Sequence, residues 1–268
     1  MLSSIVSYAD MIFVVDNNSE NKHDVEKICK SFPKVKFVEI GFNSGVHALN
    51  IGISLALRGG AELILLLDQD SYVVSEAIKK VLRIIERLHK DTLNKIAVIN
   101  LPKSIPRDIK RKISRFRGRL IISPHFLMPF SGTIIRANVL KDKGIKIREG
   151  FFLDQADFDF FYRLKRLGFL TCMYVDGLLE HKLGTPLLIG RKLLPYENSW
   201  RYYLIVRNST ILLLEGVIPP LFYFSQLIGF LYPLWLVEGF RKALKSLITG
   251  LAHGLFKKRD TWIQYFSK

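Results

Sequence analysis

Short apolar runs that end in polar residues recur in the amino-terminal part of the chain. Residues 63–67 form an unbroken aliphatic run after a Gly-Gly pair, which predicts a buried strand with parallel neighbours. Residues 35–40 alternate between apolar and polar positions, as half-buried strands do. Similar patterns predict strands at 12–15, 95–101 and 171–175 and helices at 22–31, 46–58, 75–90, 138–143 and 157–167. The length of 268 residues suits one α/β domain with an appendage.

Two carboxylates follow the run at 63–67, because the sequence continues Asp68-Gln69-Asp70. In open α/β sheets, ligands bind beyond the carboxyl ends of the strands. Two carboxylates this close repel each other unless a cation lies between them, and a hard divalent metal that carries a diphosphate meets that need. The other interpretation of this pair is a solvated turn.

Two further polar segments lie next to apolar ones. Residues 16–19, Asp-Asn-Asn-Ser, end the run at 12–15 and either bind a ligand or cap the next helix. Residues 43–52, NSGVHALNIG, open a helix with small residues. Their glycines allow either close approach to a ligand or close packing of the helix.

Acids interrupt an aromatic segment at 151–163, FFLDQADFDFFYR. Asp154, Asp157 and Asp159 lie among side chains that would otherwise form a core, where acids are costly unless they are partnered or functional. Asp157 is expected in the first turn of the helix at 157–167. The helix dipole should keep a carboxylate there ionised and able to accept a proton.

The order of these motifs resembles the inverting glycosyltransferases of family two, which have the GT-A fold. The resemblance rests on VVDNNS, NSGVHALNIG, LLLDQDS, FSGTIIR and FFLDQADFDFFYR, followed by a His before a Leu-Gly pair. The Asp-Gln-Asp variant and the downstream segment RYYLIVRN at 201–208 resemble the rhamnosyltransferase-like branch. The resemblance runs from about residue 10 to the carboxyl terminus.

The resemblance implies a fold, a reaction and a set of site residues. The expected fold is α/β, with a Rossmann-like, mixed, mainly parallel sheet flanked by helices. The expected reaction moves a sugar, L-rhamnose in that branch, from a nucleotide diphosphate sugar to a glycan or lipid-linked acceptor in polysaccharide biosynthesis, with inversion and with Mg²⁺ or Mn²⁺. The implied residues are Asp157 as catalytic base; Asp16, Asn17, Asn43, Gly45, Asp68, Gln69 and Asp70 for the nucleotide sugar; Ser131, Gly132, Asp154, Arg201 and Arg207 for the acceptor; and Asp70 and His181 for the metal.

Some of these assignments have ordinary alternatives. Arg201 and Arg207 could grip a phosphate bidentately or form salt bridges on a helix surface. Gly132 could belong to a simple turn, and a lone histidine such as His181 is often a surface or packing residue.

The start of the chain departs from the family pattern. Family members usually begin with an apolar strand that ends near a Tyr-Asn pair, whereas residues 2–8 look like the end of the helix that follows that strand. We therefore expect the first strand to be absent from this sequence, through a misplaced start or a degenerate copy. A degenerate copy gives the alternative function, a non-catalytic membrane-bound module that binds nucleotide sugars.

The composition of the chain indicates an anionic partner. The net charge is +16 and no zinc-finger or RNA-stacking motif is present, so a nucleotide diphosphate and anionic lipid head groups are expected rather than nucleic acid. The two cysteines, Cys29 and Cys172, are not in metal-binding spacing and fit a reducing compartment or core packing. The sequence predicts no cleavable signal peptide and no particular oligomeric state.

The carboxyl-terminal part is apolar and then basic. Residues 221–237 carry no formal charge and are followed by Arg241, Lys242, Lys245 and a basic run at 257–259. This segment could span a membrane, lie in its interface or form a helical hairpin packed on protein; its short length and Pro233 favour the interface. The expected organisation is a catalytic domain at 1–208 and a membrane-associating region at 209–268, at the cytoplasmic face of the cell membrane. The basic stretch at 102–119 is expected to be a charged loop, with contact to lipid phosphate as the alternative.

Overall fold

The computed structural model describes residues 2–73, 75–102, 118–122, 129–176, 179–181, 187–189, 192–194 and 196–256. The chain forms two compact units. Unit 1 comprises Met1–Ile147 and Phe160–Lys182, and unit 2 comprises Arg148–Asp159 and Leu183–Lys268. The domain boundary expected after residue 208 falls inside a continuous helix, so the structure divides the chain at other places. The basic loop expected at 102–119 lies largely outside the described residues.

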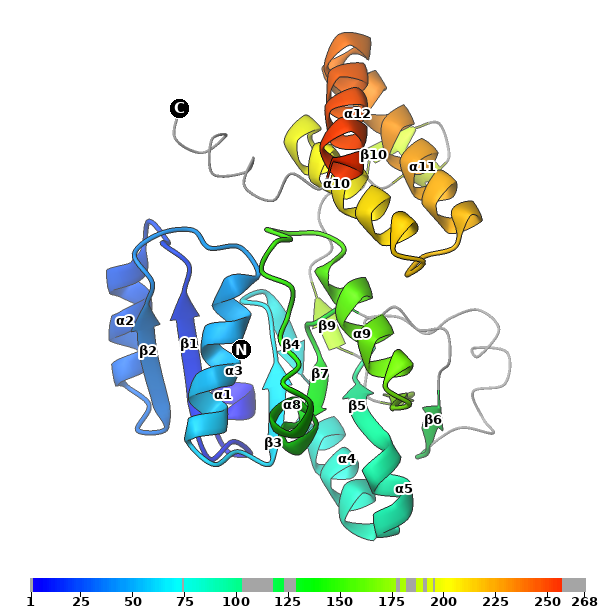
Figure 1. Cartoon of the computed structure of the whole chain (residues 1–268). Coiled ribbons are helices and arrows are strands. Elements are labelled where there is room, and N and C mark those ends of the chain that lie inside the picture. The colour runs from blue at the N-terminus through cyan, green and yellow to red at the C-terminus, as the bar shows by residue number, and fades with distance from the viewer. Residues whose placement is uncertain are drawn as a thin grey trace. The chain divides into compact units, whose positions relative to one another are not determined.

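Strands and helices alternate along most of unit 1 (Figure 1), which confirms the expected α/β class. The strands are β1 (Ile12–Asp16), β2 (Val35–Glu39), β3 (Leu63–Leu66), β4 (Ser71–Val73), β5 (Ile96–Asn100), β6 (Leu120–Ile122), β7 (Thr133–Arg136), β8 (Leu170–Tyr174) and β9 (Leu179–His181). The helices are α1 (Leu2–Ile5), α2 (Lys22–Lys30), α3 (His47–Arg58), α4 (Ser75–Arg87), α5 (Lys90–Lys95), α8 (Ala137–Lys143) and α9 (Ala156–Arg166), the last of which begins in unit 2.

The largest sheet of unit 1 is mixed, with the strand order β3-β7-β5-β8-β6. Strands β3, β5 and β8 run in one direction, and β7 and β6 run in the other. The run at 63–67 was expected to have parallel neighbours, but β3 pairs antiparallel with β7. The reason is the chain reversal before β7, where the N–H of Gly132 donates to the carbonyl of Leu66 at 2.8 Å and brings β7 alongside β3.

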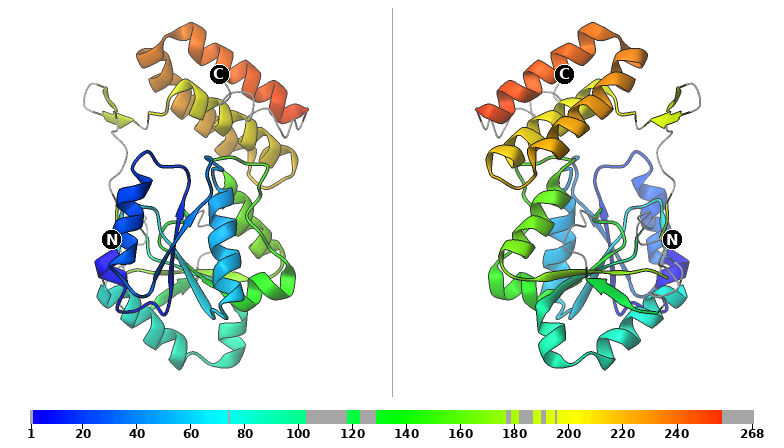
Figure 2. Two further views of the ribbon diagram at one scale, coloured as in Figure 1. Left: turned by 90° about the vertical axis from the view of Figure 1, so that its left-hand side faces the viewer. Right: turned by 90° about the vertical axis from the view of Figure 1, so that its right-hand side faces the viewer.

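Strands β1 and β2 form a separate parallel sheet. Strand β3, at the edge of the largest sheet, pairs with β7 and not with β1. Helix α3 packs on β1 and on β3, and α2 and α3 lie on opposite sides of β1 and β2 (Figure 2). A Cβ at Gly52 would lie 3.3 Å from Cγ2 of Val15, so this glycine allows close packing of α3 on β1. Among the described strands, β1 pairs only with β2.

The core of unit 1 lies around β5, all five residues of which are buried. One face of α4 contributes Ala77, Ile78 and Val81 to this core. Both cysteines are buried and unbridged, as core packing requires.

Unit 2 contains a hairpin and three long helices, and the three helices pack together (Figure 1). These are β10 (Leu187–Ile189), β11 (Lys192–Leu194), α10 (Ser199–Leu214), α11 (Pro220–Glu238) and α12 (Phe240–Leu255). Residues 202–212 of α10 are buried. A Cβ at Gly250 would lie 2.7 Å from Cβ of Val206, and one at Gly254 would lie 2.6 Å from Cβ of Thr210. Glycine at these positions therefore lets α12 approach α10 closely.

Helix α11 covers the apolar segment predicted at 221–237 and continues through Pro233. Among the described residues it is the one helix long and apolar enough to cross a membrane, and only 22% of its most apolar window is buried. Several of its large side chains are exposed, including Leu221, Phe224, Ile228 and Trp235.

Candidate active site

The loops that follow the parallel strands β1 and β2 are tied together by one amide side chain. Asn17 accepts hydrogen bonds at Oδ1 from the backbone N–H (2.7 Å) and the hydroxyl (2.8 Å) of Ser44, and its Nδ2 donates to Oδ1 of Asn43 (3.0 Å) and to the carbonyl of Gly45 (3.3 Å). Gly45 has a φ of 57°, which glycine adopts without strain. The structure thus brings together Asn17, Asn43 and Gly45, three of the residues predicted to bind the nucleotide sugar.

Asp16 shapes the first of these loops. It is 5% exposed, and its Oδ2 accepts the N–H groups of Asn18 and Ser19, each at 3.1 Å. These bonds close a local turn rather than capping α2, whose N-cap residue is Asn21.

The segment Asp68-Gln69-Asp70 follows the carboxyl end of β3 and is exposed. The buried Ser131 holds the backbone of this segment, because its hydroxyl accepts the N–H of Asp68 at 3.0 Å and lies 2.6 Å from the hydroxyl of Ser71. The segments LLLDQDS and FSGT therefore meet, as expected for one site. Ser131 was predicted to face the acceptor, but it is 1% exposed and supports the aspartate loop instead. Gly132 has a φ of 84°; its N–H donates to the carbonyl of Leu66 at the end of β3, and its carbonyl accepts the N–H of Leu101, just after β5, at 2.7 Å.

The predicted metal ligands Asp70 and His181 are neighbours in backbone register. Strand β9 pairs antiparallel with β4, and His181 lies opposite Ser71, the residue after Asp70. The side chain of His181 lies outside the described residues. A carboxylate and an imidazole suit a divalent metal such as Mn²⁺, so these two residue types fit the expected ion. Within the described part of the chain, no group of three or more His, Cys, Asp or Glu side chains could hold a metal.

The three acids of the aromatic segment have different surroundings in unit 2. Asp154 pairs with Arg201 through two hydrogen bonds, of 2.9 and 3.2 Å. Asp159 is 1% exposed and lies 3.6 Å from Arg148, which also pairs with Glu215 at 2.9 Å. Asp157 is half-buried in the first turn of α9, where its Oδ1 accepts the N–H of Phe158 at 2.9 Å.

The backbone immediately before α9 is strained. Asp154 and Gln155 have φ values of 31° and 69°, a conformation that costs roughly 1–3 kcal/mol for each non-glycine residue. Gln155 is 5% exposed, and its Oε1 has no hydrogen-bond partner among the described residues. Such a turn persists only where surrounding contacts fix it.

The arginines predicted to bind the acceptor have partners within unit 2. Arg201 contacts Asp154 and also donates to Glu197 at 2.7 Å. Burial raises the pKa of the Asp154 carboxyl, and the Arg201 guanidinium opposes that shift. Arg207 is 1% exposed and donates to the carbonyl of Gly150 at 3.2 Å and to Oδ1 of Asn208 at 2.6 Å. The acceptor roles of Asp154, Arg201 and Arg207 stay predictions. In the structure these side chains form contacts within unit 2 that stabilise it.

Asn208 was not predicted from the sequence to be a site residue. Its Nδ2 donates to the carbonyls of Leu153 (3.1 Å) and Asp154 (2.9 Å). The signal for it was present, since Asn208 ends the polar-interrupted motif RYYLIVRN in an otherwise apolar helix.

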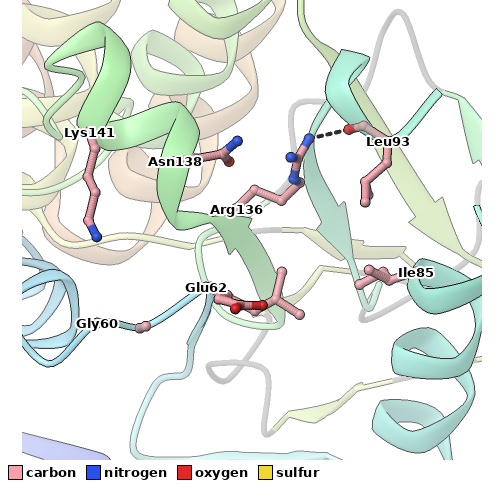
Figure 3. A pocket seen from close by; sticks show the side chains of 9 residues that line it. Gly60, Glu62, Ile85, Leu93, Arg136, Asn138 and Lys141 are labelled. Carbon is pink, nitrogen blue, oxygen red and sulfur yellow. Dashed lines mark hydrogen bonds between the residues drawn. The ribbon is translucent and has the colours of Figure 1, made fainter. Parts of the chain in front are cut away.

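A pocket of about 360 Å³ lies at the other end of β3 from Asp68 (Figure 3). It is lined by Glu62, Ile85, Asn138 and Lys141 and by Arg136, whose guanidinium donates to the carbonyl of Leu93. Because ligands of α/β sheets bind beyond the carboxyl ends of strands, this pocket is separate from the candidate site.

Comparison with known proteins decides the family. Residues 1–140 match Glycosyl transferase family 2. The chain belongs to this family. The matched part of this glycosyltransferase contains all the residues from Asp16 to Gly132 discussed above, whereas Asp157, His181 and the arginines lie beyond it.

Relatives and solved structures agree with this assignment. The glycosyltransferase is 27% identical over 222 residues to the dTDP-rhamnosyl transferase RfbF of Shigella flexneri, which covers 78% of this chain and 73% of the relative. Residues 1–349 of S. aureus TarS, solved with UDP, align with a TM-score of 0.50 and 13% identity over 94% of this chain and 86% of that one. GalNAc-T7, solved with UDP, GalNAc and Mn²⁺, aligns with a TM-score of 0.51 and 13% identity over 68% of this chain and 39% of that one. The predicted GT-A fold and the rhamnosyltransferase-like resemblance are confirmed.

Proposed function

We propose that this glycosyltransferase moves a sugar from a nucleotide diphosphate sugar to a hydroxyl of a glycan or lipid-linked acceptor, with inversion at the anomeric carbon, in polysaccharide biosynthesis. The observation that carries this proposal is the place of Asp157, which lies half-buried in the first turn of α9. A helix start stabilises an ionised carboxylate, which a general base requires.

In the proposed reaction, Asp157 accepts the proton of the acceptor hydroxyl as its oxygen attacks the anomeric carbon. The new carbon–oxygen bond forms on the face opposite the departing diphosphate. The bond between the anomeric carbon and the diphosphate oxygen breaks, and the nucleotide diphosphate leaves with the electron pair. Asp16, Asn17, Asn43 and Gly45 form the loops proposed to hold the nucleoside, and Asp68, Gln69 and Asp70 lie beside the proposed diphosphate position.

A divalent cation is proposed as the cofactor. Asp70 and His181 would hold it, since the β4–β9 ladder sets their backbones next to each other. When bound, Mg²⁺ or Mn²⁺ would offset the negative charge of the diphosphate. The Mn²⁺ named with GalNAc-T7, which shares the fold, supports this proposal.

The proposed donor is dTDP-L-rhamnose. The support is the similarity to a protein named as a dTDP-rhamnosyl transferase. The acceptor class rests on the family resemblance alone.

We further propose that the protein works at the cytoplasmic face of the cell membrane. The support is the exposed apolar face of α11 and the exposed Arg241, Lys242 and Lys245 that follow it in α12. Apolar side chains and adjacent cations suit an interfacial helix on anionic lipid.

The second candidate function is a non-catalytic membrane-bound module that binds nucleotide sugars. The observation considered for this module is that, among the described strands, the β1–β2 sheet is separate from the sheet that contains β3. The two candidates differ in one result, since the module would bind donor without transferring sugar.

Substitution Asp157→Asn tests the proposed reaction, because it keeps the shape of the side chain and removes the proton acceptor. Sugar transfer should fall by about a hundredfold or more. Calorimetric binding of nucleotide diphosphate should remain. Asp142→Asn, an exposed carboxylate on α8, is the matched control and should transfer at the wild-type rate. Wild-type transfer by Asp157→Asn would remove Asp157 from the mechanism.

A further inference from the structure

The turn that leads into α9 is held from one side by α10. Asn208 donates from Nδ2 to two consecutive carbonyls of this turn, those of Leu153 and Asp154. Arg201, seven residues earlier on the same helix, forms a two-bond contact with the Asp154 carboxylate. A spacing of seven residues returns to the same face of a helix, so one face of α10 holds both the backbone and the side chain of Asp154.

Each of these two contacts is fixed in turn by a neighbour. The amide of Asn208 is oriented because its Oδ1 accepts from Arg207, which also reaches the carbonyl of Gly150. The guanidinium of Arg201 is oriented by Glu197, four residues earlier and just before α10. Asn208 is fully buried, whereas the side chain of Arg201 is 37% exposed.

The turn that α10 holds, at Asp154 and Gln155, has a strained backbone. Asp154 and Gln155 both have positive φ values, and the buried Oε1 of Gln155 adds a further cost because it has no hydrogen-bond partner among the described residues. Strained backbone of this kind persists where surrounding contacts over-determine it, and Asn208 and Arg201 supply such contacts. The turn ends two residues before Asp157, so its conformation sets where the first turn of α9 begins.

We propose that Asn208 and Arg201 are positioning residues that hold the turn at Asp154 and Gln155 and thereby fix the place of the Asp157 carboxylate. This inference rests on the proposed function, in which Asp157 is the base. The two residues act through the turn and have no contact with the reacting atoms in this scheme. Their loss should displace the carboxylate and leave the nucleotide loops of unit 1 unchanged.

The experiment measures kcat, KM for the nucleotide sugar and nucleotide diphosphate affinity in the full chain. Asn208→Asp keeps the size of the side chain but cannot donate to the two carbonyls. Arg201→Lys keeps the charge but loses the two-pronged contact. Both variants should lower kcat by about tenfold or more with unchanged nucleotide affinity, since small displacements of a catalytic group are costly.

Ser209→Ala is the matched control, because Ser209 is equally buried on α10 but its hydroxyl donates to Gln226 of α11 at 3.3 Å. It should retain the wild-type kcat. Arg201→Lys should also move the acidic limb of the kcat–pH profile to higher pH, since a carboxylate displaced from a helix start is less easily ionised. Arg201→Lys decides the question alone if Asn208→Asp does not fold.

Three outcomes overturn the proposal. One is a kcat equal to that of Ser209→Ala. Another is a parallel loss of kcat and nucleotide affinity, which would indicate a purely structural role. The last is an unshifted acidic limb in Arg201→Lys. Failure of the proposed function is distinguishable, because it would appear as wild-type transfer by Asp157→Asn in the same assay.

Discussion

At the scale of single residues, the surroundings of a side chain decide its chemistry more than its type does. Asp154, Asp157 and Asp159 lie within six positions of one another. Asp154 forms an ion pair with Arg201, and Asp159 lies close to Arg148. Asp157 lies in the first turn of α9. The same distinction separates the buried Asp16, which closes a turn, from the exposed Asp68 and Asp70.

The proposed metal ligand Asp70 can be tested by removing one negative charge. Asp70→Asn should weaken Mn²⁺-dependent binding of nucleotide diphosphate, because a neutral amide oxygen is a poorer ligand than a carboxylate. Calorimetry with and without Mn²⁺ measures the effect. Binding without metal should change little, and Asp142→Asn should retain the metal dependence. If Asp70→Asn shows the wild-type response to Mn²⁺, Asp70 is not a ligand.

The sequence predicted which loop residues would meet, but not which would be buried. The family resemblance grouped Asn17, Asn43 and Gly45, and the structure joins them through Asn17. Ser131 was placed toward the acceptor, yet it supports Asp68 from the interior. Its burial depends on contacts with a segment about sixty residues away, which no local pattern reports.

At the scale of elements, periodicity predicted the longer helices and strands of unit 1 but not their partners, and it did not predict short elements such as β4, α5 and β6. The helix at α12 needs Gly250 and Gly254 to approach α10, and the sequence alone does not show which helix they face. Strand β3 was expected to have parallel neighbours because its residues are uniformly apolar. Its burial instead alternates, and β7 lies antiparallel beside it.

The exposed apolar face of α11 can be tested for its role in membrane binding. Leu221 and Ile228 are 83% and 67% exposed, so Leu221→Glu with Ile228→Glu should leave the fold intact. Burial of each such side chain stabilises by about 1.5–3 kcal/mol, and each nearby cation adds about 1 kcal/mol on anionic lipid. The double variant should lose sedimentation with anionic liposomes.

Salt and a matched variant control this measurement. High salt should release the wild-type protein only in part, because salt screens the cations but not apolar burial. Leu188→Glu changes a comparably exposed residue, 66% exposed, on β10 and should bind as the wild type does. A wild-type protein that stays in solution with neutral and anionic liposomes alike at low salt would contradict the membrane proposal.

At the scale of the whole molecule, the order of motifs was enough to predict the GT-A class, which the alignments confirm. Two parts were expected, but their bounds differ from those of the two units, since α10 is continuous across residue 208 and the segment Arg148–Asp159 belongs to unit 2. Among the described strands, the β1–β2 sheet is separate from the sheet that contains β3, and the absence of the family's first strand stays a prediction.

Sugar transfer by the full chain is the central claim, and the configuration of the product tests it most directly. The full chain would be incubated with dTDP-L-rhamnose, Mn²⁺ and lipid-linked acceptors extracted from membranes, and the new anomeric centre would be assigned by NMR. We expect rhamnose on the acceptor with the anomeric configuration opposite to that of the donor. A product with retained configuration would contradict the inverting mechanism, and metal-dependent donor binding without transfer from any nucleotide sugar tested would contradict the enzyme itself.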